Sequence, residues 1–305
     1  MSEPLYTPAP LPVPPSLLGE SPFWHPDEAA LYWCDIPGKT LNRYRPATAS
    51  HDQWHFDCEP ASCAPMMGGD LLLAMRDGLW RFSPATGQRR LLCTPPYNPA
   101  HERFNDGKAD PQGRFWVGTI YEPRDPPLAA LYCWRSDGLA RMAADATVSN
   151  GLAFSPDGHT LYWSDTKAHC VHAFDLDPVA GSLSAQRVFA QFTPRAEGQA
   201  LDDYGGRPDG AAVDAEGCYW ICGNDAGQVH RFTPEGKLDR SLTLPVKKPT
   251  MCAFGGPNLD TLFVTSIRPT GIDLTDQPLA GGVFALDPGT YGLPEPLFSS
   301  IPVSR

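Results

Sequence analysis

The chain has 305 residues, including 34 prolines, 28 glycines and nine cysteines, and its formal net charge is −11. A chain of this length can bury a full hydrophobic core, and its acidity, unrelieved by any local cluster of Lys or Arg, argues against nucleic-acid binding. No apolar run is long enough to span a membrane, and cysteines without a CxxC pair favour reduced thiols.

The first segment, residues 1–15 (MSEPLYTPAPLPVPP), is rich in proline and is predicted to be a tail in front of a single folded domain, residues 16–305. It lacks the basic start and the apolar run of a signal peptide, so we expect a cytoplasmic protein. Part of the tail can add a strand to the last repeat, although its prolines restrict such a strand to a sheet edge.

A three-part unit recurs six times along the rest of the chain. A turn rich in Asp, Pro and Gly is followed by a short apolar strand, and then by a second strand with an aliphatic residue and, three positions later, a large apolar one. The first strands begin at Leu31, Leu71, Phe115, Leu161, Tyr219 and Leu262, and the later pairs are Leu41/Tyr44, Leu79/Phe82, Leu131/Trp134, Val171/Phe174, Val229/Phe232 and Val283/Leu286.

The spacing of the units predicts the fold. From Tyr44 onward, the last residues of successive pairs lie 38, 52, 40, 58 and 54 residues apart, which brackets the length of a propeller blade. No long window has helical periodicity, and short strands between turns indicate an all-β chain. A β-sandwich would not require six copies of one unit, so we predict an all-β, six-bladed β-propeller.

Polar residues stand just before most of the turn-and-strand units. The first strand of a blade lines the central channel of a propeller, so these residues should face one mouth of that channel. Blade two has only CEPASCAPM at the matching place. The residues are Glu20 in blade one, Arg103, Asn105 and Asp106 in blade three, Asn150 in blade four, Asp209 in blade five, and Lys248 and Thr250 in blade six.

Four of these residues predict a metal site on the channel axis. Asn105, Asn150 and Asp209 occupy equivalent positions in different repeats, and Glu20 lies at a similar distance before its own strand. Oxygen ligands suit a hard divalent ion, and the lack of His and Cys argues against a structural zinc site. A simpler interpretation treats the Asn-Gly and Asp-Gly pairs as turn residues, although glutamate is not a turn former.

Five segments follow one another along the chain: LGESPFWHPDEAALYWCDIPGKTLNRY, RFNDGKADPQGRFWVGTI, SNGLAFSPDGHTLYWSDT, PDGAAVDAEGCYW and PLAGGVFALDP. They resemble the regucalcin/gluconolactonase family of sugar lactonases, which is also called senescence-marker-protein-like, and the resemblance runs from about Leu17 to Leu286.

The resemblance implies one divalent ion in the channel, held by Glu20, Asn150 and Asp209, with Arg103 and Asn105 facing the substrate. Glu122 in GTIYEP is the nearest match to a family glutamate that contacts the sugar, but the prolines after it depart from the family pattern. The ligand type favours calcium, and the family also leaves zinc, manganese and ferrous iron open.

A lactone is a cyclic ester, so its hydrolysis needs a polarised carbonyl, a positioned water and stabilisation of the oxyanion. We expect the ion to supply the first and the third, and Asp209 to be both a ligand and the general base. Arg103 and Asn105 would orient the sugar. In a competing assignment Asp209 is a ligand only, and hydroxide on the ion is the nucleophile.

The predicted function is therefore hydrolysis of a sugar-acid lactone of the glucono-, xylono- or arabinolactone type, by a monomer or weak dimer with a small-molecule substrate. The alternatives are a metal-dependent esterase or phosphotriesterase, a non-catalytic calcium-binding regulator, and a platform for protein interactions. Substrate contacts from Arg103 and Asn105 favour an enzyme, because a protein that only binds calcium would not need them. No ordered Ser-His-Asp set is visible, and His101 is a further candidate at the channel mouth.

Overall fold

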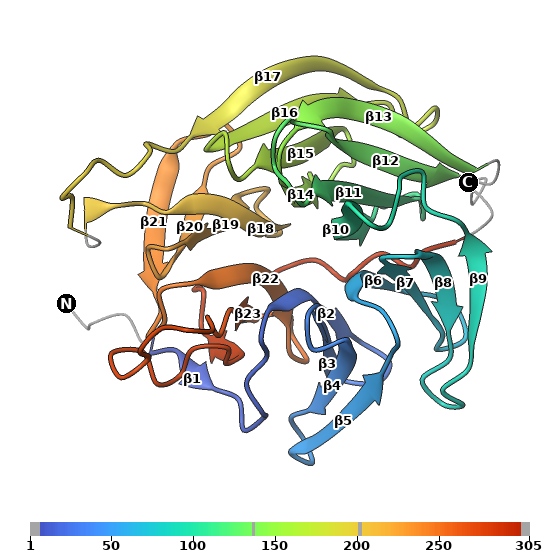
Figure 1. Ribbon diagram of the computed structural model, residues 1–305, viewed down its shortest axis with the longest axis horizontal. Coiled ribbons are helices and arrows are strands. Elements are labelled where there is room, and N and C mark those ends of the chain that lie inside the picture. The colour runs from blue at the N-terminus through green and yellow to red at the C-terminus, as the bar shows by residue number, and fades with distance from the viewer. Residues whose placement is uncertain (1–6, 136–137, 201–202, 300–305) are drawn as a thin grey trace.

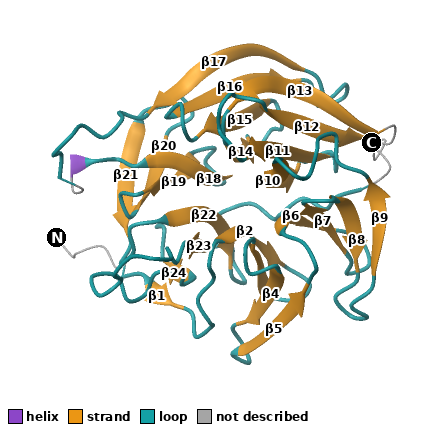
Figure 2. Ribbon diagram, in the orientation of Figure 1, coloured by secondary structure: helices purple, strands orange, loops and turns teal. Residues whose placement is uncertain are grey.

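The structure is a computed structural model that describes residues 7–135, 138–200 and 203–299. These residues form six antiparallel sheets of four strands each, arranged as a ring around a central channel (Figure 1). Nearly all of the regular structure is strand (Figure 2). The predicted all-β, six-bladed propeller is confirmed.

The strands follow one another outward in each blade. Blade one contains β2 (Gly19–His25), β3 (Ala30–Asp35), β4 (Thr40–Arg45) and β5 (Ser50–His55); blade two contains β6 (Pro60–Pro65), β7 (Leu71–Met75), β8 (Gly78–Phe82) and β9 (Arg89–Cys93); blade three contains β10 (Glu102–Ala109), β11 (Phe115–Tyr121), β12 (Ala129–Arg135) and β13 (Gly138–Ala146). Blade four contains β14 (Ser149–Phe154), β15 (Thr160–Asp165), β16 (Cys170–Leu176) and β17 (Leu183–Gln191); blade five contains β18 (Arg207–Val213), β19 (Tyr219–Asn224), β20 (Gln228–Phe232) and β21 (Leu238–Thr243); blade six contains β22 (Pro249–Gly255), β23 (Thr261–Ser266), β24 (Phe284–Leu286) and β1 (Ala9–Pro10).

The ring is closed by the N-terminal segment. Ala9 pairs with Ala285 and Pro10 with Phe284, so β1 becomes the outer strand of the sheet that β22 to β24 begin. Proline is tolerated there because the outer side of an edge strand needs no N–H donor. The strand expected from the proline-rich segment is therefore present, and it ties the beginning of the described chain to its last blade.

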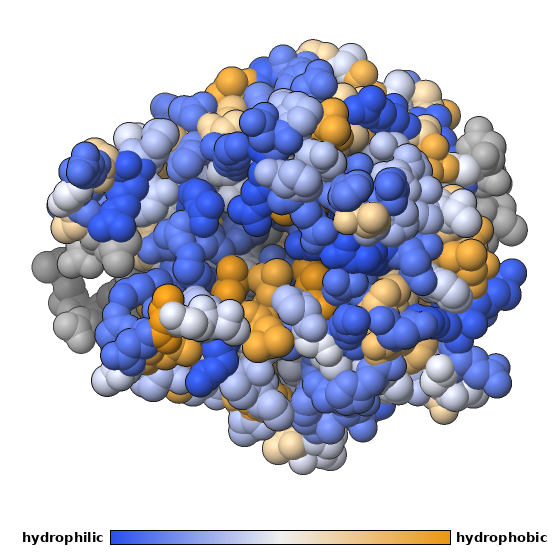
Figure 3. All heavy atoms as spheres, in the orientation of Figure 1, coloured by the Kyte–Doolittle hydropathy of each residue, from blue (hydrophilic) through white to orange (hydrophobic). Residues whose placement is uncertain are grey.

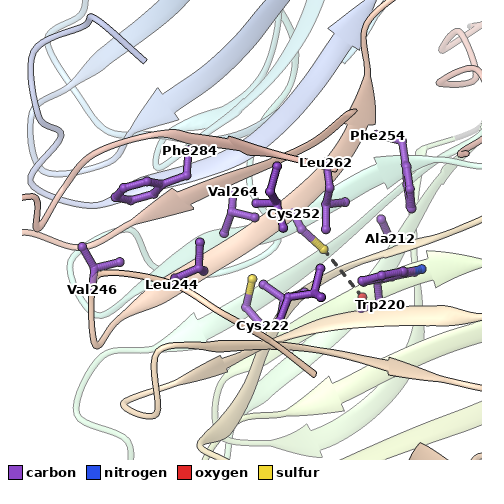
Figure 4. Packing of buried hydrophobic residues seen from close by; sticks show 13 residues of the cluster. Ala212, Trp220, Cys222, Leu244, Val246, Cys252, Phe254, Leu262, Val264 and Phe284 are labelled. Atoms are coloured by element: carbon purple, nitrogen blue, oxygen red, sulfur yellow. Dashed lines mark hydrogen bonds between the residues drawn. The ribbon is translucent and has the colours of Figure 1, made fainter. Parts of the chain in front are cut away.

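The apolar middle strands form the core because both of their faces are covered. All six residues of β3 are buried, as are all five of β7, whereas the outermost strands β5, β9, β17 and β21 are mostly exposed or half-buried. Strands covered on both faces read as continuous apolar runs. Between blades five and six, for example, Trp220, Phe254 and Leu262 pack together with Ala212 (Figure 4).

The turns that the sequence marks with Asp and Gly are fixed by their aspartates. In DPQG, Asp110 Oδ1 accepts hydrogen bonds from the backbone N–H groups of Gln112 and Arg114, each at 2.9 Å. Its other oxygen accepts one from Trp116 Nε1 at 2.8 Å, so the turn is anchored to the core of its blade. Such Asx-type turns explain why this residue type recurs before the middle strands.

A segment near the C-terminus, residues 292–298, crosses one mouth of the channel, and we call it the strap (red in Figure 1). At one end Gly292 bridges to Asp214, which follows β18, and at the other Phe298 bridges to Met66, which follows β6. A Cβ at residue 292 would lie 2.1 Å from Phe254 Cβ, so the close approach requires glycine. The strap thus covers the mouth at the C-terminal ends of the inner strands.

No helix in the described part of the chain has both the length and the hydrophobicity needed to cross a lipid bilayer.

Candidate functional site

The opposite mouth holds the polar residues that the sequence singled out. The first apolar residue of each middle strand pairs with a residue of the inner strand; in blade one, for example, Leu31 pairs with Trp24. Counting back four positions from that partner gives the equivalent residue of each blade, which is Glu20 in blade one. The six residues at this position are Glu20, Ala61, Asn105, Asn150, Asp209 and Thr250. The register read from the repeats is therefore correct, and each inner strand has a β-bulge or similar irregularity at or just after this residue.

A chain of hydrogen bonds joins three neighbouring blades at this mouth. Arg103 Nη1 donates to Asn105 Oδ1 at 2.7 Å, and Asn105 Nδ2 donates to Asn150 Oδ1 at 2.7 Å. Asn150 Nδ2 in turn donates to Asp209 Oδ1, again at 2.7 Å. All four residues are nine-tenths or more buried. The predicted residues of blades three, four and five thus meet in one polar network.

Asp209 is held at both of its oxygens, because Asn224 Nδ2 donates to Oδ2 at 2.7 Å while Asn150 occupies Oδ1. Burial raises the pKa of Asp209 to about 7; the hydrogen bond from Asn224 opposes this rise, and the negative charge of Asp106 adds to it. Each oxygen still has a free lone pair. A fixed carboxyl with a pKa near neutrality is suited to accept a proton at physiological pH.

Glu20 lies at the same mouth, on the inner strand β2 of blade one. Its pKa is raised well above the usual value, first by burial and then by the negative charges of Asp209 and Asp106, while Arg103 lowers it. Two buried carboxylates that repel each other resist being charged together unless a cation lies near them. Arg103 lowers the pKa of Glu20 too little to offset these effects, so a bound cation would stabilise the two charged carboxylates further.

The donor set fits an oxygen-ligated cation better than a nitrogen- or sulfur-ligated one. In residues 7–135, 138–200 and 203–299 no three His, Cys, Asp or Glu side chains are grouped so that they could hold a metal ion. Any ion at this mouth would thus depend on an amide oxygen beside the carboxylates of Glu20 and Asp209. Asn224 Oδ1 is also buried without a hydrogen-bond partner, so one further amide oxygen at this mouth is free to accept. Hard divalent ions accept such mixed oxygen ligands.

Arg76 of blade two forms an ion pair with Glu122 at the edge of this mouth. Its guanidinium donates to both carboxylate oxygens of Glu122, at 2.8 and 3.0 Å, and to both oxygens of Glu59, at 2.9 and 3.2 Å. Arg103 Nε lies 3.7 Å from Glu122 Oε1. The Glu122 side chain is 40% exposed, against 19% for Arg76 and 11% for Arg103. The carboxylate thus lies between two arginines, within reach of both.

The remaining candidates have other contacts. Thr250 donates its hydroxyl to the backbone oxygen of Gly19, and Lys248 pairs with Asp225. His101 is exposed, and its backbone oxygen accepts a hydrogen bond from Glu122 N–H at 2.9 Å. Thr250 and Lys248 therefore stabilise the blade six side of the mouth.

Three residues of the network were not assigned from the sequence. They are Arg76, Thr166 and Asn224, and each lies five positions after the first apolar residue of its middle strand. Thr166 Oγ1 accepts a hydrogen bond from Asn150 Nδ2 at 2.8 Å and donates one to the backbone oxygen of Pro208 at 2.7 Å. The same repeat register that located the inner-strand residues marks these positions, where the other three blades have isoleucine.

Replacing Arg76 with glutamine should raise the KM for substrate roughly tenfold, which is about 1.4 kcal/mol, with less effect on kcat. Without Arg76, Glu122 would turn to Arg103 and compete for it with any ligand that Arg103 binds. Steady-state kinetics check this. Adding Glu122→Gln to the variant should restore KM, and an unrestored KM would contradict the role given to Arg76.

Three comparisons with known proteins bear on the site. Residues 18–268 match the sequence profile of the SMP-30/gluconolactonase/LRE-like region. A 6-deoxy-6-sulfogluconolactonase from Pseudomonas putida is 40% identical over 288 residues, which cover 93% of this chain and 96% of the relative. A pentonolactonase from Haloferax volcanii is 34% identical over 286 residues, covering 91% and 93%.

A solved structure is also similar over nearly the whole chain. The crystal structure of regucalcin, described as a calcium-binding protein, from Agrobacterium tumefaciens superposes with a TM-score of 0.89 at 29% identity and covers 96% of this chain and 98% of that one. The similarity thus includes all six blades and both mouths of the channel.

Proposed function

Because the chain belongs to the SMP-30/gluconolactonase/LRE-like family, we propose that it hydrolyses a sugar-acid lactone to the aldonic acid at the mouth formed by Glu20, Asn150 and Asp209. Relatives named as lactonases of two different sugars, each similar over nine-tenths of the chain, support lactone hydrolysis. The observation that carries the proposal is the buried chain of hydrogen bonds from Arg103 through Asn105 and Asn150 to Asp209.

We further propose that Glu20, Asn150 and Asp209 hold one divalent ion. Calcium suits their oxygen atoms best, and zinc, manganese and ferrous iron are alternatives. The support is the pair of buried carboxyl groups, whose repulsion a cation would relieve. When bound, such an ion would polarise the lactone carbonyl and stabilise the oxyanion as a Lewis acid.

Residues of the chain supply the proton transfer and the orientation of the substrate. Asp209 accepts a proton from a water whose oxygen attacks the carbonyl carbon, and the bond from that carbon to the ring oxygen then breaks. The proton passes to the ring oxygen, which becomes a hydroxyl group, so that water and lactone give the open acid. Arg103 and Asn105 bind sugar oxygens and hold the carbonyl against the water. Burial of the network limits competing solvent.

A pH-stat assay with glucono-, xylono- and arabinono-lactones, with and without a chelator, tests this proposal. We expect release of acid from at least one lactone and loss of that release in chelator. Hydrolysis of a simple phosphotriester or aryl ester, but of no lactone, would instead identify an esterase or phosphotriesterase. Calcium binding without hydrolysis of any of these compounds would identify the second candidate, a calcium-binding regulator, which the similarity to regucalcin favours.

The carboxyl groups at this mouth should destabilise the metal-free protein as the pH rises from about 5 to 8. The folded-state pKa is raised for Glu20, for Asp106 (to about 6) and for Asp209 (to about 7), so at these three groups the folded protein binds more protons than the unfolded chain above about pH 4. Stability is lost as each group ionises in place. Thermal unfolding measures this, and the slope should be smaller in Asp209→Asn; an equal slope in that variant would contradict the assignment.

A further inference from the structure

A cavity of about 210 Å³ lies at the mouth that the strap covers. Its walls come from the C-terminal ends of β10, β14, β18 and β22, with the strap as the remaining side. In the orientation of Figure 1, the molecular surface is hollowed near the centre of the ring (Figure 3). Lys108, on the cavity wall, lies three residues beyond Asn105 on β10, which is roughly 10 Å along the strand. The cavity is therefore separate from the pocket around Asp209.

Two opposite charges face each other inside this cavity. Lys108 Nζ lies 3.9 Å from Glu295 Oε2, and their side chains are only 11% and 15% exposed. That distance is too long for a hydrogen bond, and within the described ranges neither charged group has a hydrogen-bond partner. A sheltered ammonium and carboxylate with unfilled donors and acceptors are costly unless something polar lies against them.

The strap holds the carboxylate in place. Glu295 is flanked by Pro294 and Pro296, whose rings fix the backbone on both sides. The strap is anchored by the hydrogen bond from Phe298 N–H to the backbone oxygen of Pro65 at 2.7 Å, and by that from Gly292 N–H to Leu259 at 2.8 Å. Glu295 is thus presented to Lys108 by a rigid segment, as a preorganised binding group.

The rest of the wall is mainly apolar. It includes Phe154, Phe254 and Leu293, together with small residues such as Ala153 and Ala212. An engineered cavity of 150 Å³ holds benzene, so this one has room for a ligand of about eight or nine non-hydrogen atoms. Such walls disfavour a polyol, which makes the cavity unsuited to a second sugar or to its acid.

The charges decide which head group the ligand carries. A simple carboxylate would satisfy Lys108 but meet the negative charge of Glu295, and a simple amine would leave the donors of Lys108 unused. A ligand with both charges complements both groups.

We propose that this cavity binds a small zwitterion with an apolar body, of the size and chemistry of leucine, with its carboxylate on Lys108 and its ammonium on Glu295. The site goes beyond the proposed hydrolysis and shares no ligand with it.

Isothermal titration calorimetry of the full chain with L-leucine tests the proposal. We expect one site per chain with a Kd of about 1 mM or lower. L-Serine, 4-methylpentanoate and 3-methylbutylamine, which lack the apolar body, the ammonium and the carboxylate respectively, should each bind at least about tenfold more weakly. The comparison of ligands on the unaltered protein needs no variant that might fail to fold.

Lys108→Met and Glu295→Gln should each weaken leucine binding at least about tenfold, while Lys167→Met, a matched change in an exposed lysine beyond β15, should leave it unaltered. No leucine binding at about ten times the expected Kd would overturn the proposal. Equal binding of leucine and 4-methylpentanoate, or full affinity in folded Glu295→Gln, would overturn it as well.

Discussion

Replacing Asp209 with asparagine should lower kcat/KM for lactone hydrolysis by about 10³- to 10⁴-fold. The variant keeps the shape of the side chain, but its NH2 group cannot accept the hydrogen bond that Asn150 or Asn224 donates to that oxygen, and the amide cannot accept a proton. It also removes one of the two buried carboxylates that would hold the ion, so affinity for a divalent ion should fall with it. Steady-state kinetics and metal titration measure the two effects.

The pH–rate profile separates the two roles of Asp209. If this carboxylate is the base, the acidic limb of the wild-type profile should disappear in the variant even when the metal is saturating. A variant that retains metal, the acidic limb and the full rate would refute the assignment of the base. Asp175→Asn is a matched control at an exposed position, and it should change neither rate nor metal content.

Replacing Arg103 with methionine should lower kcat/KM by about 10²-fold or more and leave the metal content unchanged. The guanidinium is buried next to Asn105, and its positive charge faces Glu20. Its loss removes the proposed contact with the substrate and frees Asn105 to rotate, but takes away no metal ligand. Kinetics and metal analysis of the same sample give both values.

Arg187→Met removes an arginine of the same size from an exposed pair with Asp175 and should be neutral in both measurements. Loss of the bound ion from Arg103→Met, at unchanged folding, would show that Arg103 supports the cation site itself. The contrast with Asp209→Asn is therefore the informative one, because the two variants should differ in metal content while both lose activity.

The repeat was the strongest signal in the sequence. The six apolar middle strands are buried on both faces, so they appear in the sequence as uninterrupted hydrophobic runs, each preceded by a turn. Counting from those runs located the inner-strand position shared by Glu20, Asn150 and Asp209, because a fixed strand register carries a residue to the same place in each blade.

The same counting could have found Arg76, Thr166 and Asn224, at the ends of the middle strands, but only the inner strands were expected to face the channel. The strap was beyond prediction for a different reason. Residues 292–298 are not part of any repeat, so no register places Glu295 beside Lys108. That pair depends on where an irregular segment crosses the mouth, which local sequence does not determine.

The most direct test of the account is to remove all metal from the wild-type protein with a chelator and titrate divalent ions back while lactone hydrolysis is followed. We expect the stripped protein to be inactive, and its activity to return in proportion to bound ion until one ion per chain is reached, with no such return in Asp209→Asn. A stripped protein that hydrolyses the lactone at the full rate would contradict a cation held by Glu20, Asn150 and Asp209 as the centre of the reaction.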